Sequence, residues 1–295
     1  MKIHCFQHLN KETLENIGTR IVQKGHTITK TLLYEEPFFP DPEEFDMLLI
    51  MGGTMSVYQE EKYPWLKPEK EFVREVIKSG KPVLGSCFGA QMISEVLGGK
   101  VTKNRFKEIG WHTVRSLERK SPSSSISLEL PYCISNSFTA FMWHGDTFEI
   151  PAGAVKLFES EACPNQGFIY NGNILGLQFH PEADRQWIRN LIDDSGHELI
   201  EGKYVKSKKD IFEQENLLEG SRYLAYSLWN GLRKSVSERL NTSFGCNCGF
   251  PFHFKKSASA TFSITSSGMC SSPDASISAS VMPNRERIPF FLESE

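Results

Sequence analysis

The sequence lacks the features that mark several large classes of protein. No apolar run approaches the roughly 20 residues that a membrane-spanning helix needs, and residues 1–8 are too short and too polar a stretch for a signal peptide. The formal net charge of −3 over 295 residues excludes the strongly basic surface with which proteins bind nucleic acid or anionic membranes. We therefore expect a soluble, cytoplasmic protein with no nucleic-acid and no membrane partner.

The number and placement of the cysteines argue against a disulfide framework. The cysteines are odd in number and scattered, which is typical of reduced thiols in the cytoplasm. They are Cys5, Cys87, Cys133, Cys163, Cys246, Cys248 and Cys270. Cys246, Cys248 and Cys270 come near His253, but this spacing is not that of a four-ligand zinc site. We therefore expect neither a metal nor another cofactor.

Against these absences, the first hundred residues alternate between apolar runs and helical patterns. Strands are expected at 3–6, 27–34, 46–51 and around Val83 and Leu84, and helices at 11–24, 65–79 and 91–97. In the helix at 11–24, the residues expected on the buried face are Leu14, Ile17, Ile21 and Val22. Continuous apolar strands followed by helices predict an α/β fold, a parallel sheet with helices on both faces. Ligands of such sheets bind at the carboxyl ends of the strands.

In the second part of the sequence, short β-type segments replace the alternation of strands and helices. Short β-type segments are expected at 110–114, 125–130, 140–143, 155–158, 167–170 and 174–179, as antiparallel additions to the same domain. Helices are expected at 183–191 and 210–233. Beyond about residue 235 the chain is rich in serine and has little periodicity. We therefore predict one domain over 1–234 and a Ser-rich, disordered or loosely packed tail over 235–295.

Cys87 follows a short apolar run and is framed by Gly85 and Gly89. Glycines at these positions allow the sharp turn and close packing that a nucleophile between a strand and a helix requires. A thiol there faces the positive end of the following helix's dipole, which favours the reactive thiolate. The alternative is an inert, buried core cysteine. The glycine frame favours the nucleophile.

His180 and Glu182 offer the base and the orienting group that a cysteine nucleophile needs. They end an apolar strand and are separated only by Pro181, so in extended backbone their side chains point the same way. Alternatively, His180 is a hydrogen-bonded structural histidine and Glu182 a charge at a helix N-terminus. With a nucleophile at Cys87, a Cys–His–Glu triad is the more economical interpretation.

Attack by a thiolate on a carbonyl creates an oxyanion, which backbone N–H groups must stabilise. Phe88, the residue after the nucleophile, would supply one such group. The glycine loop after the strand at 46–51, Gly52-Gly53, is in the right place to supply the second. An ordinary strand-ending turn is the alternative for this loop.

Four motifs occur in order along the chain: Met-Gly-Gly-Thr-Met-Ser at 51–56, Gly-Ser-Cys-Phe-Gly-Ala-Gln at 85–91, Trp-His-Gly-Asp at 143–146 and Gly-Leu-Gln-Phe-His-Pro-Glu at 176–182. Together they resemble the class I, or triad-type, glutamine amidotransferase domain, in particular the glutaminase domain of GMP synthase and its stand-alone relatives. The resemblance covers about residues 1–189. It implies a flavodoxin-like, mostly parallel sheet with antiparallel additions.

The resemblance also implies the catalytic roles. Cys87 would be the nucleophile, His180 the general base and acid, and Glu182 the residue that orients it. The N–H groups of Gly53 and Phe88 would form the oxyanion hole. The reaction implied is release of ammonia from glutamine through a γ-glutamyl thioester, which water then hydrolyses.

By the same resemblance, Gln91 and the backbone around Gly145 and Asp146 would hold the α-amino and carboxylate groups of glutamine. Thr54 stands where many members of the family carry proline, a change that leaves the donor backbone in place. No phosphate-binding loop follows Arg189, and the remaining residues are too few and too polar for an ATP-using domain. Ammonia is therefore expected to pass to a separate synthetase subunit, or to no acceptor.

Three functions are compatible with these observations. The first is a stand-alone, glutamine amidotransferase-like enzyme that hydrolyses the γ-amide of glutamine. The second keeps the triad but acts, like a γ-glutamyl peptidase, on glutathione-type conjugates. The third is a non-catalytic regulatory module with the same fold.

Overall fold

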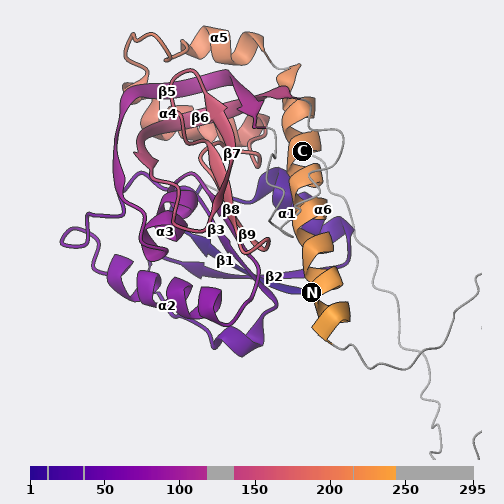
Figure 1. The fold of residues 1–295 in the computed structure, drawn as a ribbon. Helices are drawn as coiled ribbons and strands as arrows, with labels where there is room; N and C mark the ends of the chain where they lie inside the picture. The colour runs from indigo at the N-terminus through magenta and orange to yellow at the C-terminus, as the bar shows by residue number, and fades with distance from the viewer. Residues whose placement is uncertain (12, 36, 118–135, 215, 244–295) are drawn as a thin grey trace, which may run out of the picture. The chain divides into compact units, whose positions relative to one another are not determined.

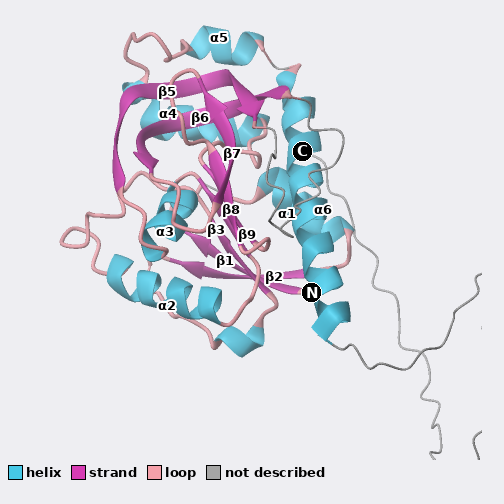
Figure 2. Ribbon diagram, in the orientation of Figure 1, coloured by secondary structure: helices cyan, strands magenta, loops and turns pink. Residues whose placement is uncertain are grey.

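A nine-stranded sheet runs through the part of the chain that the structure describes (Figures 1 and 2). This computed structural model describes residues 1–295 except 12, 36, 118–135, 215 and 244–295. The described elements all belong to one unit, Met1–Cys246, and the second unit, Asn247–Glu295, lies outside the described residues. The strand order is β2-β1-β3-β4-β9-β8-β7-β5-β6.

The strands are β1 (Lys2–Gln7), β2 (Thr27–Leu32), β3 (Met47–Ile50), β4 (Val83–Ser86), β5 (Val101–Ser116), β6 (Ser137–Phe148), β7 (Val155–Ser160), β8 (Gly167–Tyr170) and β9 (Ile174–Leu177). The α-helices are α1 (Glu15–Gln23), α2 (Leu66–Lys78), α3 (Phe88–Val96), α4 (Arg185–Ser195), α5 (Lys208–Glu213) and α6 (Leu217–Ser243). Two short 3₁₀ helices are η1 (Pro42–Glu44) and η2 (Gly196–Glu198).

The first five strands in this order, β2, β1, β3, β4 and β9, pair in parallel, and helices cover both faces of that part of the sheet. Helices α1 and α6 share one buried cluster with the sheet, whereas α2 and α3 share another. All of β3 is buried, as an apolar strand between two layers of helices must be. The α/β fold and the flavodoxin-like strand order are therefore confirmed.

The antiparallel additions are as extensive as the parallel part, with four strand pairs each. Strands β5 and β6 have 16 and 12 residues, far longer than the expected segments at 110–114 and 140–143. Their register shifts between Lys103 and Glu108. This long pair of strands carries the Trp-His-Gly-Asp motif of β6 to the cavity that Cys87 lines.

Two of the expected helices differ from those observed. The helix expected at 11–24 begins at Glu15, and Val22 is 64% exposed, so its placement on the buried face was wrong. One residue advances a helix by about 100°, which turns position 22 away from the stripe that contains Ile21. The single helix expected at 210–233 is two helices, α5 and α6, and a capping box of Ser207 and Asp210 begins α5.

Helix α6 continues to Ser243, beyond residue 234, where the domain was expected to end. The rest of the expected tail lies outside the described residues, as do Cys246, Cys248, His253 and Cys270. The β segment expected at 125–130 and Cys133 also lie outside them.

Three clusters of buried apolar side chains hold the described elements together. One joins the sheet to α1 and α6, a second joins it to α2 and α3, and the third lies between α4, α5 and the β5–β6 pair.

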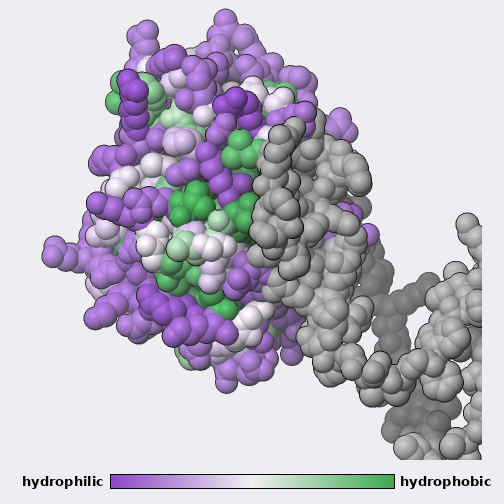
Figure 3. All heavy atoms as spheres, viewed as in Figure 1, coloured by the Kyte–Doolittle hydropathy of each residue, from purple (hydrophilic) through white to green (hydrophobic). Residues whose placement is uncertain are grey.

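On the face drawn in Figure 3, hydrophilic residues cover the rim and hydrophobic residues gather near the middle. None of the helices in the described ranges combines the length and apolarity that crossing a bilayer requires.

Candidate active site

A cavity of about 360 Å³ opens at the carboxyl ends of β3 and β4, where the parallel sheet was expected to bind its ligand. Six of the sequence-predicted site residues line it: Gly53, Cys87, Gln91, Gly145, Asp146 and His180. The other two lie directly behind this lining. Phe88 follows Cys87 in the chain, and Glu182 is hydrogen-bonded to His180. The structure thus brings all the predicted site residues to one place.

Cys87 sits at a strained turn between β4 and α3. Its φ of +52° and ψ of −107° put a non-glycine residue in the left-handed half of backbone space, which is costly and typical of functional sites. The Cys87 N–H donates to the Leu177 carbonyl oxygen at 2.7 Å, so the end of β9 holds the turn in place. The thiol lies at the first turn of α3, facing the positive end of the helix dipole.

The glycine frame has the close packing that the sequence predicts. A Cβ added to Gly85 would lie 2.4 Å from the carbonyl carbon of Gly89. One added to Gly89 would lie 2.1 Å from the Ile50 carbonyl oxygen. Helix α3 therefore packs directly on the backbones of β3 and β4, and this contact fixes the direction in which Cys87 points.

His180 and Glu182 form a buried pair. The Nδ1 atom of His180 lies 2.8 Å from Oε1 of Glu182, and both side chains are almost fully buried. The backbone N–H of His180 donates to the Phe141 carbonyl oxygen at 2.9 Å, which ties this segment to β6. The Trp187 ring of α4 packs beside the imidazole, with 4.8 Å between ring centroids.

Opposing influences act on the protonation of His180. Burial by itself would lower the pKa of His180, but the negative charges of Cys87 and Glu182 outweigh it and raise the pKa well above its ordinary value. The Nε2 atom is buried and has no hydrogen-bond partner among the described residues. The site therefore favours the protonated form of His180.

The other described cysteines contrast with Cys87. Cys5 and Cys163 are also free and buried. Burial raises the pKa of the Cys5 thiol to about 12, with the Lys30 charge opposing and the Glu182 charge adding to this effect. Cys5 therefore stays protonated and unreactive at neutral pH.

Ser86 was not predicted as a site residue, although it directly precedes Cys87. Its hydroxyl lies 3.0 and 2.8 Å from the two carboxylate oxygens of Glu182. Asn16 of α1 also holds this segment, because its N–H donates to the Glu182 carbonyl oxygen and its side chain to that of Ala183. Both residues fix the position of Glu182.

The two predicted oxyanion donors have unused backbone N–H groups within the described part of the chain. There, neither Gly53 nor Phe88 donates its backbone N–H to a hydrogen bond. The Phe88 N–H opens helix α3, and Gly53 lines the cavity beside Cys87. These are the properties that an oxyanion hole requires.

Asp146 and Gln91 are held by neighbours that the sequence did not single out. The Oδ2 atom of Asp146 accepts hydrogen bonds from Ser56 at 2.6 Å and Tyr58 at 3.0 Å. Gln91 donates to Gln178 at 3.2 Å, and Gln178 lies 3.6 Å from the Cys87 sulfur. The signal for Gln178 was its polarity within the apolar strand motif at 176–182.

One wall of the cavity carries charge that the sequence did not reveal. Lys103, Asn104 and Lys107 of β5 line it together with Glu198 of η2. Lys107 and Glu198 form an ion pair at 2.6 Å. These residues lie outside the family motifs, so no sequence signal marked them. Within the described residues, no group of three or more His, Cys, Asp or Glu side chains is arranged to hold a metal ion.

Comparison with known proteins agrees with this geometry. The family model described as glutamine amidotransferase class-I matches residues 6–193. The glutamine amidotransferase-like protein YfeJ of Salmonella typhimurium is 29% identical over 220 residues, which cover 72% of this chain and 89% of that protein. The GMP synthase (glutamine-hydrolysing) of Vibrio vulnificus is 34% identical over 195 residues, or 60% of this chain. This chain spans only 35% of the GMP synthase's length.

Solved structures share the fold. A glutamine amidotransferase of Thermotoga maritima has 30% identity and a TM-score of 0.64, over 79% of this chain and 98% of its own. A glutamine amidotransferase of Methylobacillus flagellatus, at 23% identity, matches the fold with a TM-score of 0.72 over 79% of this chain and 94% of its own. The family model covers most of the described sheet together with Cys87, His180 and Glu182. The chain therefore belongs to the class I glutamine amidotransferase family.

Proposed function

We propose that this protein hydrolyses the γ-amide of glutamine through a thioester on Cys87. The observation that carries the proposal is the meeting, in one cavity, of a cysteine at a strained turn with the buried His180–Glu182 pair. A strained nucleophile backed by an oriented base is the arrangement that acyl transfer needs. Family membership supports the same class of substrate.

The steps follow from the contacts around Cys87. The thiolate attacks the amide carbon, and the oxyanion that forms accepts hydrogen bonds from the N–H groups of Gly53 and Phe88. His180 gives its proton to the amide nitrogen, the carbon–nitrogen bond breaks and ammonia leaves. A water molecule then gives a proton to His180 and attacks the thioester, which releases glutamate and restores the thiolate. These side chains and backbone groups supply every proton transfer that the two half-reactions require.

The test is ammonia release from glutamine by the purified protein beside a Cys87→Ala variant. We expect the variant to lose at least about 10³-fold in kcat, since removing a triad nucleophile removes the covalent route. Cys5→Ala is the matched control, because Cys5 is a buried thiol outside the cavity. Equal rates in the Cys87 variant and the unaltered protein would refute the proposal.

The charged wall of the cavity favours a second candidate substrate. Ammonia is a small leaving group that needs no charged partner, yet Lys103 lines the cavity beside the Lys107–Glu198 ion pair. A γ-glutamyl peptide would present a carboxylate that such a wall can bind. Comparison of kcat/KM for glutamine, glutathione and other γ-glutamyl peptides separates the two candidates. A non-catalytic module would instead leave Cys87 unlabelled by a glutamine-analogue electrophile.

We also propose a cytoplasmic location and a separate synthetase subunit as the ammonia acceptor. The thiolate mechanism needs a reducing environment, and the three cysteines among the described residues are free. The similarity to glutamine-hydrolysing GMP synthases supports an ammonia-accepting partner. Labelled amide nitrogen from glutamine that appears in a product only when the partner is present would establish this partnership.

A further inference from the structure

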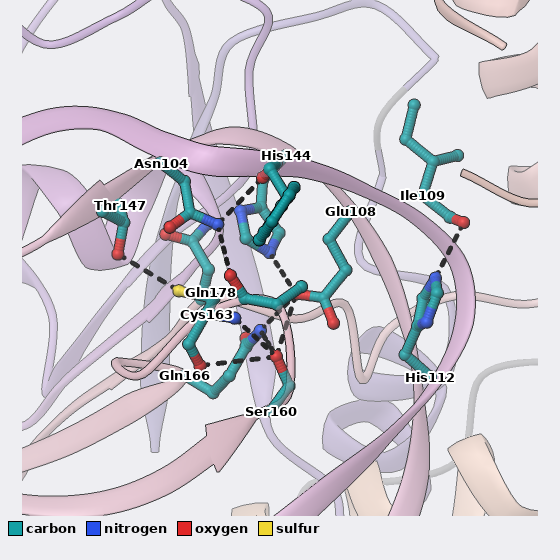
Figure 4. Close-up of polar contacts among 12 residues, drawn as sticks. Asn104, Glu108, Ile109, His112, His144, Thr147, Ser160, Cys163, Gln166 and Gln178 are labelled. Atoms are coloured by element: carbon teal, nitrogen blue, oxygen red, sulfur yellow. Dashed lines mark hydrogen bonds and ion pairs between the residues drawn. The ribbon is translucent and has the colours of Figure 1, made fainter. Parts of the chain in front are cut away.

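A cluster of buried polar side chains surrounds Glu108 of β5 (Figure 4). Glu108 is only 1% exposed. Its Oε2 atom accepts hydrogen bonds from Gln166 at 2.7 Å and Ser160 at 3.1 Å. The same oxygen lies 3.1 Å from Nε2 of His144. A single carboxylate oxygen is therefore within hydrogen-bond distance of three side chains.

His144 connects this cluster to the cavity that Cys87 lines. It belongs to the Trp-His-Gly-Asp motif, lines the cavity and is 5% exposed. Its Nδ1 atom lies 3.0 Å from the carbonyl oxygen of Asp146, two residues further along β6. Because a carbonyl oxygen can only accept, the hydrogen of this bond must reside on Nδ1.

The remaining contact of His144 requires one more proton. With Nδ1 protonated, a neutral imidazole has a bare lone pair on Nε2, which would face the lone pairs of Glu108 Oε2. A separation of 3.1 Å is a hydrogen bond only if a further proton lies between the two atoms. Glu108 and His144 therefore share a proton, whichever of the two atoms carries it.

The residue that this pair holds is a predicted substrate-binding residue. The side chain of Asp146 is already fixed through Oδ2 by Ser56 and Tyr58. His144 fixes its backbone carbonyl, so Asp146 is held from both sides. Gly145 lies between the two residues and lines the cavity as well.

We propose that Glu108 and His144 are a positioning pair that sets the backbone of Gly145 and Asp146 for recognition of the substrate's α-amino and carboxylate groups. This inference rests on the proposed glutamine-hydrolysing function. It assigns the pair no part in bond breaking. The pair acts on substrate binding through the Asp146 carbonyl, while Cys87, His180 and Glu182 carry out the chemistry.

Glu108→Gln tests the shared proton with little change in shape. The amide oxygen can still accept from Ser160 and Gln166, but the amide supplies neither an acidic proton nor a negative charge. With the amide oxygen in the place of Oε2, where it accepts these two hydrogen bonds, a neutral His144 has one N–H for two acceptors. If it donates to the new amide, its Nδ1 lone pair faces the Asp146 carbonyl, and the loop must move.

The measurements are kcat and KM for glutamine and the rates at which two reagents label Cys87. We expect Glu108→Gln to raise KM about ten- to hundredfold, as loss of a buried, charge-assisted hydrogen bond does, with kcat nearly unchanged. Labelling by 6-diazo-5-oxonorleucine, which carries the α-groups of glutamine, should slow by the same factor. Labelling by iodoacetamide, which lacks them, should not change.

Glu161→Gln is the matched control. Glu161 is a neighbouring exposed glutamate that pairs with Lys203 and Tyr204 and does not contact His144. Its substitution should leave both labelling rates and KM as they are. A slowdown of both reagents in Glu108→Gln would mean general damage to the site and would overturn the inference.

His144→Asn provides the second variant. The asparagine amide can donate to the Asp146 carbonyl from the place of Nδ1 and needs no proton from Glu108. Adding Glu108→Gln to His144→Asn should therefore cost nothing further in KM, so the double-mutant cycle reveals the coupling. An undiminished effect of Glu108→Gln in the His144→Asn background would contradict the pair.

The outcomes also separate this inference from the function on which it rests. An unaltered protein that is alkylated by iodoacetamide but neither hydrolyses glutamine nor reacts with its analogue would refute both. Turnover by the unaltered protein with a KM that Glu108→Gln does not change would refute the positioning pair alone.

Discussion

The charge on His180 is the residue-scale property from which a pH dependence follows. Burial acts to lower the pKa of this group, and the charges of Cys87 and Glu182 raise it well above the ordinary value. The protonated form donates to the leaving nitrogen, so activity must fall as pH rises through this raised pKa. The alkaline limb of the kcat/KM profile therefore reports His180.

Glu182→Gln removes one of the charges that raise the pKa of His180. The alkaline limb of kcat/KM should then move to lower pH, and kcat should fall by roughly 10²- to 10⁴-fold as the imidazole loses its oriented, charged partner. The measurement is a pH profile of ammonia release. Glu182→Asp keeps the charge and should shift the limb less. A limb that stays in place in Glu182→Gln would contradict the role of Glu182.

At this scale, the sequence predicted the residues whose chemistry depends on local pattern. Cys87 was identified by its glycine frame, and His180 with Glu182 by their spacing around a proline. Ser86 and Lys107 were missed because their contacts join segments distant in sequence: Ser86 reaches Glu182, and Lys107 reaches Glu198. No spacing rule within one segment reveals such pairs.

At the scale of elements, the approach of α3 to β3 depends on a glycine. In a solvent-exposed helix, Gly→Ala stabilises by up to about 1 kcal/mol because alanine is the better helix former. In α3, however, a Cβ on Gly89 would lie 2.1 Å from the Ile50 carbonyl oxygen. Gly89→Ala should therefore lower the free energy of unfolding by about 1–3 kcal/mol or more and reduce kcat by displacing Cys87.

Gly220→Ala in α6 is the matched control for this prediction. Gly220 is exposed and has nothing within 4 Å of an added Cβ, so the substitution should raise stability slightly and leave kcat unchanged. Thermal or urea unfolding and ammonia release measure both variants. A Gly89→Ala protein as stable and active as the Gly220→Ala protein would show that α3 can shift without consequence.

Elements were predictable where one periodicity dominated. The apolar run of β3 and the stripe of α2 predicted a strand and a helix close to those observed. The full length of β5 was not predictable, since charged residues are frequent at its start and its stability comes from pairing with β6 rather than from its own pattern. The end of α6 was missed because the serine-rich composition from about residue 235 suggested a loss of structure.

At the scale of the whole molecule, helix α6 belongs to the core of the domain although it lies beyond all of the family motifs. Leu224, Leu228 and Trp229 of α6 are buried against α1 and the sheet in one core cluster. Loss of a buried leucine or tryptophan side chain typically costs about 2–5 kcal/mol, and a domain's total stability is about 5–15 kcal/mol. A chain that ends before Leu217 should therefore not fold, although it retains every residue of the proposed triad.

A chain that ends at Ser243 keeps this helix and removes only residues outside the described part of the sequence. We expect it to unfold within a few degrees of the full chain and to release ammonia at the same kcat/KM, because the cavity and the three core clusters lie within residues 1–243. Thermal unfolding and glutamine turnover of chains 1–295, 1–243 and 1–216 make the comparison. Loss of activity in 1–243 with unchanged unfolding would assign residues 244–295 a part in catalysis. Folding of 1–216 would instead show that the α1–α6 contact contributes little to stability.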